Sequence, residues 1–181
     1  SVYAWPDVAI HLHVLPDGRV LTFADDDNPN YPTTGARLAG STKTYVVDIP
    51  NGGVPGTVVA LPNNHTNMFC SGHTYLYDGR LFVIGGHLGQ DGWGEPNTDV
   101  FDFHLPYNWS SGPDMWQGRW YPSGVQLANG DVLAISGTFD PDGSSSAIPE
   151  VWSPANPTSW RQLTNASRVL PYYPFTFLAP N

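Results

Sequence analysis

Apolar runs recur along the chain in pairs, and each pair is separated by a short turn signal. The paired runs and the turns between them are 10–16, 17–18 and 19–23; 73–77, 78–79 and 80–84; and 123–128, 129–130 and 131–135. The turn dipeptides are Asp17-Gly18, Asp78-Gly79 and Asn129-Gly130. Such dipeptides between β-prone runs favour hairpins with two-residue type I′ turns, in which both central residues have positive φ. The pattern therefore predicts three β-hairpins.

Two further β-prone runs follow each hairpin. They are 43–48 and 57–61, then 98–103 and a short segment near Trp109, then 150–153 and 159–163. The hairpin turns begin at residues 17, 78 and 129, a repeat near the upper end of the lengths that propeller repeats show. Each unit is thus expected to form a four-stranded antiparallel meander, which is the blade of a β-propeller.

The predicted fold is all-β, a partial β-propeller over residues 1–181. Its blade-like units lie at about 8–61, 69–112 and 121–164, and a truncated unit begins at 172. Asn181 occupies the turn position, so residues 173–179 are expected to form the first strand of a fourth blade. Because propellers usually close with four to eight blades, we expect missing blades or a second chain to cover the uncovered sheet faces. A three-bladed stack closed by oligomerisation is the alternative.

Composition narrows the functional classes. The chain has 19 Gly and 18 Pro but only 7 Lys and Arg, which argues against a helical fold. The net charge of −9 argues against binding to nucleic acid or to anionic membranes. A single cysteine makes no internal disulfide, and no apolar run has the length of a membrane span. Sequons at Asn64, Asn108 and Asn165, with few lysines, indicate a secreted, extracellular protein.

Three motifs carry a family resemblance. Phe82-Val83-Ile84-Gly85-Gly86 resembles the double-glycine strand end of kelch blades. Asn67-Met68-Phe69-Cys70-Ser71-Gly72 resembles the cysteine segment of galactose oxidase and glyoxal oxidase. Pro113-Asp114-Met115 followed by Arg119-Trp120-Tyr121-Pro122 resembles the tyrosine segment of the same family of copper radical oxidases, as found in its glyoxal-oxidase-like members. With the opening blade and Tyr173-Pro174-Phe175, the likeness runs through nearly all 181 residues, as the early part of a kelch-type propeller.

The resemblance implies a chemistry. In that family a cysteine and a tyrosine on neighbouring blades form a thioether, and the modified tyrosine is a copper ligand that carries a radical. The enzyme oxidises a primary alcohol or an aldehyde and reduces O₂ to H₂O₂. By resemblance, Cys70 and Tyr121 are this pair and Tyr121 is a copper ligand. Phe139 stands where galactose oxidase has the tryptophan that stacks on the thioether, so a stacking ring without an indole N–H is expected.

The repeat supports this pairing independently of the family. Cys70 begins the inner strand of one unit and Tyr121 begins that of the next, so both lie at corresponding positions on one rim. A one-copper enzyme needs a second one-electron store for a two-electron oxidation, and a phenol with a sulfur substituent supplies one. The alternatives are a buried structural thiol for Cys70 and a packing aromatic for Tyr121.

The family's other copper ligands, two histidines and a second tyrosine, belong to later blades. None of the histidines here matches those ligand segments; they are His11, His13, His65, His73, His87 and His104. His11 and His13 alternate on one strand face, and imidazoles at this spacing can share a metal. The favoured interpretation is that these histidines are polar residues lining a channel or rim. Asp25-Asp26-Asp27-Asn28 is interpreted as a solvated acidic loop rather than a calcium site.

Two functional hypotheses follow. The first is a portion of a secreted copper-radical oxidase acting on an alcohol, an aldehyde or a sugar, inactive as this fragment alone. The second is a non-catalytic kelch propeller that binds carbohydrate or protein, for example through four tryptophans expected to be exposed, Trp93, Trp109, Trp116 and Trp120.

Overall fold

The computed structural model describes residues 4–24, 42–50, 55–61, 63, 65–89 and 91–180. The acidic run at 25–28 and the turn residue Asn181 lie outside these residues. The described chain holds twelve β-strands in three four-stranded antiparallel sheets, and its one helical element is a single 3₁₀ turn, Thr164–Ala166. The predicted all-β class is therefore confirmed. No helix in the described part is long and apolar enough to cross a membrane.

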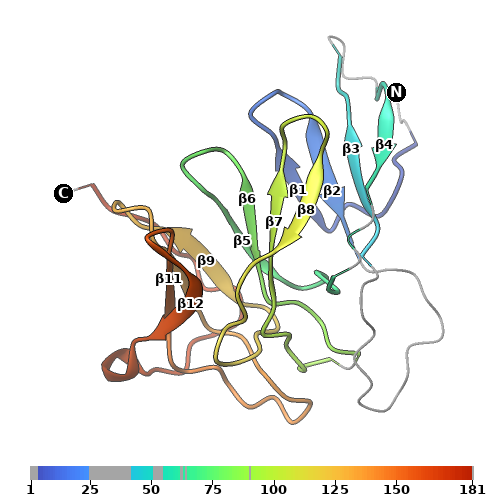
Figure 1. The fold of residues 1–181 in the computed structure, drawn as a ribbon. Coiled ribbons are helices and arrows are strands. Elements are labelled where there is room, and N and C mark those ends of the chain that lie inside the picture. Colours follow the sequence, from blue (N-terminus) through green and yellow to red (C-terminus); the bar gives the residue numbers. More distant parts are fainter. Residues whose placement is uncertain are drawn as a thin grey trace.

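Each sheet is built from four strands in sequence order. The first sheet contains β1 (His11–Val14), β2 (Val20–Phe23), β3 (Thr44–Val47) and β4 (Val58–Ala60). The second contains β5 (Gly72–Tyr75), β6 (Leu81–Ile84), β7 (Thr98–Asp102) and β8 (Asn108–Ser111). The third contains β9 (Ser123–Gln126), β10 (Val132–Ile135), β11 (Glu150–Ser153) and β12 (Asn156–Gln162). Figure 1 shows the three sheets side by side, as the predicted blades of a propeller fragment would lie.

The three hairpins form as predicted, but their turn type differs from the expectation. Only the glycine of each turn has positive φ, at 87° for Gly18, 85° for Gly79 and 90° for Gly130. In the first hairpin, Gly18 N donates to Leu15 O and Leu15 N donates to Arg19 O. This is a type I turn followed by a left-handed glycine, the three-residue hairpin loop. The aspartate thereby avoids the left-handed region, which costs energy in any residue with a Cβ.

The second sheet is buried on both faces. Along β6, Leu81 and Val83 enter a core cluster shared with the first sheet, whereas Phe82 and Ile84 enter a cluster shared with the third. Successive side chains of a strand point to opposite faces, so this uniformly apolar strand fills two cores at once. The sheets therefore pack face to face. The edges that carry the first strands, β1, β5 and β9, can contribute to a common rim.

The two ends of the stack remain apolar and exposed. On β1, Leu12 and Val14 point away from the second sheet and are exposed. Residues 167–180 leave the third sheet without forming a strand, and within them Phe175 is 92% and Phe177 is 86% exposed. The segment expected to open a fourth blade is thus extended chain without a strand partner among the described residues.

Candidate functional site

Cys70 and Tyr121 meet at the rim between the second and third sheets. Each lies two residues before the first strand of its sheet, β5 or β9, as the repeat predicted. Tyr121 N donates to Cys70 O at 2.9 Å. Both residues have left-handed backbone angles, with φ of 61° at Cys70 and 60° at Tyr121. Non-glycine residues in this region are uncommon and concentrate at functional sites, because the surrounding structure must offset the strain.

The two side chains also meet. A hydrogen bond with Cys70, reinforced by burial, raises the pKa of Tyr121 to about 12. Cys70 itself is only 2% exposed. A thiol and a phenol in hydrogen-bond contact have the proximity that a bond between sulfur and the tyrosine ring requires.

The double glycine after β6 holds the two segments together. Gly86 N donates to Arg119 O at 3.0 Å, and the next residue, His87, donates its backbone N–H to Asn67 O at 2.9 Å. A Cβ on Gly85 would collide with the carbonyl of Arg119, and a Cβ on Gly86 would collide with that of Asn67. The motif singled out in the sequence therefore lets the backbone approach the cysteine segment and the tyrosine segment at once.

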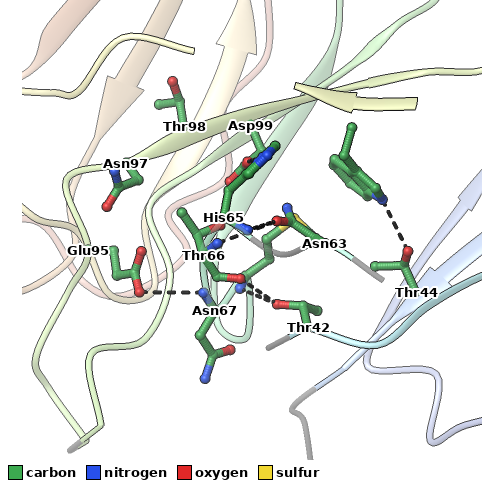
Figure 2. Close-up of polar contacts among 12 residues, drawn as sticks. Thr42, Thr44, Asn63, His65, Thr66, Asn67, Glu95, Asn97, Thr98 and Asp99 are labelled. Atoms are coloured by element: carbon green, nitrogen blue, oxygen red, sulfur yellow. Dashed lines mark hydrogen bonds and ion pairs between the residues drawn. The ribbon is translucent and has the colours of Figure 1, made fainter. Parts of the chain in front are cut away.

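A buried polar network supports the cysteine segment from the first sheet (Figure 2). Met68 N donates to Thr42 Oγ1 at 2.8 Å, and that hydroxyl donates to Thr66 O at 2.9 Å. Asn67 N donates to Glu95 Oε1 at 3.4 Å.

Asp99 on β7 continues this network. It accepts a hydrogen bond from the Thr66 hydroxyl and lies 3.4 Å from His65 Nδ1. Burial raises the pKa of Asp99, and its hydrogen bonds with Thr66 and Asn63 oppose that shift. Because buried polar groups in such networks are costly to leave unpaired, the backbone before Cys70 is fixed in place.

Arg119 fixes the tyrosine segment from the other side. Its guanidinium is wholly buried and donates to the carbonyl oxygens of Ser136, Ser146 and Ile148. It also pairs with the buried Glu150, with Arg119 Nη2 at 2.9 Å from Glu150 Oε1. Burial is the main cause that lowers the pKa of Arg119, and the charge of Glu150 opposes it.

Aromatic rings enclose Tyr121. Trp120 stacks on it with ring centroids 3.8 Å apart and planes at 10°, and Tyr173 stacks at 4.8 Å and 27°. Tyr172 stands edge-on at 5.4 Å. Neighbouring side chains of a strand point apart, but the left-handed angle at Tyr121 turns the chain and brings the Trp120 ring alongside.

Tyr173 is tied to both segments. Its backbone N donates to Tyr121 O at 3.0 Å, and its hydroxyl donates to Ser71 O at 3.3 Å. Burial, then the proximity of Cys70 and Tyr121, raises the pKa of Tyr173. In the sequence, Tyr173 carries part of the family resemblance, but no sequence pattern places Tyr173 or Trp120 at the site. The adjacency of Trp120 to Tyr121 was the available signal.

Phe139 lies in the loop after β10, half-buried, and its N donates to Ser144 O at 3.1 Å. Within the described residues, ring contacts to Tyr121 come from Trp120, Tyr172 and Tyr173, and none comes from Phe139. A role for Phe139 in the site stays a prediction.

Three histidines cluster between the first two sheets. His11 Nδ1 lies 3.3 Å from His73 Nε2, and the rings of His13 and His73 meet edge-on at 4.2 Å. His11 and His13 also stack on Phe23. Burial is the main cause that lowers their pKa values, to about 3 for His11, about 2 for His13 and about 4 for His73. The cluster is therefore neutral and forms part of the packing.

The chain was compared with known proteins. No protein-family model matches it. A WSC domain-containing protein of Arthroderma benhamiae is 25% identical over 122 residues, which are 59% of this chain and 13% of that protein. A solved fungal alcohol oxidase of the AA5 family, in complex with copper and described as having catalytic diversity, matches with a TM-score of 0.65 and 26% identity. This chain is similar in structure to part of a copper-bound fungal alcohol oxidase. The match covers 87% of this chain and 30% of that enzyme.

The similarity supports a family-level link to copper alcohol oxidases, in agreement with the resemblance of the cysteine and tyrosine segments. The residues present fit the paired cysteine and tyrosine of such a site, because Cys70 and Tyr121 already share a hydrogen bond. For copper itself, Tyr121 offers one phenolate. In the described part of the chain, no group of three or more His, Cys, Asp or Glu side chains could hold a metal ion. Among the residues that the structure describes, the donor set for copper is therefore incomplete.

Proposed function

We propose that this chain is a portion of a secreted copper-radical oxidase that oxidises a primary alcohol or an aldehyde, sugars included, and reduces O₂ to H₂O₂. The observation that carries the proposal is the meeting of Cys70 and Tyr121, through a backbone hydrogen bond of 2.9 Å and a side-chain hydrogen bond. The similarity to part of a fungal copper alcohol oxidase supports it.

Cys70 and Tyr121 would form a thioether in the mature protein. The new bond joins Cys70 Sγ to a ring carbon next to the Tyr121 hydroxyl, and the thiol hydrogen and one ring hydrogen are lost. Two electrons and two protons pass to O₂, which gives H₂O₂. The sulfur substituent makes the Tyr121 ring easier to oxidise, so that it can store one electron equivalent.

The other residues of the site would protect this ring. Trp120 and Tyr173 stack on it and would shield it in part, and the rigid segments behind Cys70 and Tyr121 hold the thiol against the phenol. Copper, when bound, would accept the Tyr121 oxygen as a ligand and supply the other one-electron change. Its remaining ligands would come from outside this chain, from further blades or a second chain, so the fragment alone is expected to be inactive.

Peptide mapping of the copper-loaded intact protein, after exposure to air, tests the proposal. We expect a cross-linked peptide that contains Cys70 and Tyr121, with a mass lower by two hydrogen atoms than the sum of its parts. Cys70 should resist alkylation after denaturation. In the Tyr121→Phe variant, Cys70 should be fully alkylated. Complete alkylation of Cys70 in the copper-loaded wild-type protein would contradict the proposal.

The second candidate is a binding module without chemistry. One observation favours binding at the surface: among Trp93, Trp109, Trp116 and Trp120, Trp116 is exposed whereas Trp109 is buried. Ligand binding by the intact protein without peroxide release from any alcohol or aldehyde would support this second function over the first.

A further inference from the structure

Trp116 is the most exposed tryptophan of the described chain. Its residue is 70% exposed, while Trp109, Trp152 and Trp160 are buried. It lies in the segment between β8 and β9, and its indole N–H reaches β12, an edge strand of the third sheet. A tryptophan ring of this exposure takes no part in the core and lies open to solvent.

Hydrogen bonds hold this exposed ring in one orientation. Trp116 Nε1 donates to Trp160 O at 2.9 Å, and Trp160 Nε1 donates in return to Pro113 O at 3.0 Å. Trp116 N donates to Glu150 Oε2 at 2.7 Å. Glu150 is itself buried and paired with Arg119. The ring is therefore pre-organised, and a ligand that stacks on it would lose little of the binding free energy to ordering.

A surface hollow begins at Arg161, the residue that follows Trp160. Its volume is about 360 Å³, and it is lined by Arg161, Gln162, Leu163, Thr164, Asn165 and Ala166. Arg161 directly follows Trp160, whose carbonyl accepts the Trp116 indole N–H. The volume is within the range of small-ligand sites. The side chains that line the hollow include amides, a hydroxyl and a guanidinium.

We propose that Trp116 and this hollow form a binding site for a neutral polysaccharide, separate from Cys70 and Tyr121. The negative face of an indole attracts the C–H groups on the apolar face of a sugar ring. The side chains of the hollow supply donors and acceptors for sugar hydroxyls. The net charge of −9 disfavours an acidic polymer. The site does not depend on the proposed oxidase function, because none of its residues touches Tyr121.

Affinity electrophoresis of the intact protein tests the site, in gels that contain mixed-linkage β-glucan, xyloglucan or glucomannan. We expect retardation by at least one of these polymers, and an apparent affinity about tenfold weaker in Trp116→Ala, the loss typical of one fixed aromatic contact. Trp116→Tyr should keep most of the binding. Leu105→Ala is the matched control, because Leu105 is also 70% exposed but lies in the turn between β7 and β8.

Asn165 needs its own control, since a glycan on its sequon would occupy the hollow. Asn165→Gln in secreted protein should bind at least as tightly as wild type. If Trp116→Ala fails to fold, the double variant Gln162→Ala/Thr164→Ala takes its place and should bind about threefold more weakly. Absence of retardation in all three polymers would overturn the proposal. So would unchanged retardation of folded Trp116→Ala, or of the double variant used in its place. Binding to polygalacturonate alone would also overturn it. A measurement of H₂O₂ release tests only the proposed oxidase function and not this binding site.

Discussion

At the residue scale, the contact between Tyr121 and Cys70 changes a pKa that an experiment can follow. The hydrogen bond with Cys70 is the main cause that raises the pKa of Tyr121 to about 12. In protein without the thioether, Cys70→Ala should lower the pKa of Tyr121 toward the ordinary value near 10. NMR titration of ring-labelled tyrosine, with Tyr121→Phe for assignment, measures this shift. An unchanged pKa would show that Cys70 does not contact the phenol.

The histidine cluster predicts how stability depends on pH. The folded-state pKa values of His11, His13 and His73 lie below the unfolded value of 6.5, so the unfolded state binds more protons in acid. Stability is complete above pH 6.5 and falls as the pH drops through 6.5 toward 4 and below. The loss between pH 7 and pH 5 is roughly 2 kcal/mol per histidine.

Urea unfolding at several pH values measures this loss. His13→Phe should make the pH dependence shallower, because it removes one of the three buried imidazoles. A free energy of unfolding that is the same at pH 7 and pH 5 would show that the three imidazoles are not buried together.

At the element scale, the double glycine after β6 joins two loops that strand pairing alone would leave apart. Gly85 has φ of 69° and lies against the carbonyl of Arg119, whereas Gly143 has φ of 79° with nothing near its Cβ position. Gly143→Ala should cost only the backbone strain of about 1 kcal/mol. Gly85→Ala carries the same strain plus a collision, so it should cost clearly more and make Cys70 react faster with a thiol reagent in protein without the thioether. Equal effects of the two substitutions on the free energy of unfolding would argue against a close contact between Gly85 and the carbonyl of Arg119.

The Arg119–Glu150 pair ties the segment before β9 to β11. Arg119→Met would leave Glu150 buried without its counter-ion, and we expect a loss of about 3–5 kcal/mol in the free energy of unfolding. Arg80→Met removes a pair with Asp78 at the surface and should cost less than about 1 kcal/mol. Urea denaturation of both variants, side by side, gives the difference. A small effect of Arg119→Met would mean that the pair does not fix the tyrosine segment.

At the scale of the whole molecule, the stack of three sheets has apolar groups exposed at both ends. Val14 at one end is 64% exposed, and Phe175 and Phe177 at the other are 92% and 86% exposed. Because apolar blade faces are normally covered by neighbouring repeats, we expect the 181-residue chain alone to self-associate. Sedimentation velocity over a range of concentrations measures this. Phe175→Ser with Phe177→Ser should weaken the association, and a wild-type chain that is monomeric throughout would contradict the expectation.

The sequence by itself determined the sheets and the place of Cys70 and Tyr121. The runs of β-prone residues and the glycine turns are local signals. The strands they predicted match the structure within a few residues, except that residues 173–179 form no strand. The repeat then put Cys70 and Tyr121 at equivalent positions, two residues before β5 and β9. The predicted type I′ turns were wrong. The same dipeptide also fits a type I turn in which the glycine that follows is left-handed, and the choice between the two turns depends on residues outside the dipeptide.

Only the tertiary structure decided which rings surround Tyr121 and which tryptophan reaches the surface. Trp120 stacks on its neighbour because the left-handed angle at Tyr121 is held by hydrogen bonds from distant loops, and no local pattern encodes that angle. Tyr173 returns to the site from more than fifty residues away, and Trp116 is oriented by partners on β11 and β12. Strands follow from the spacing of apolar residues along the chain, whereas a site depends on contacts between segments that the chain brings together only when it folds.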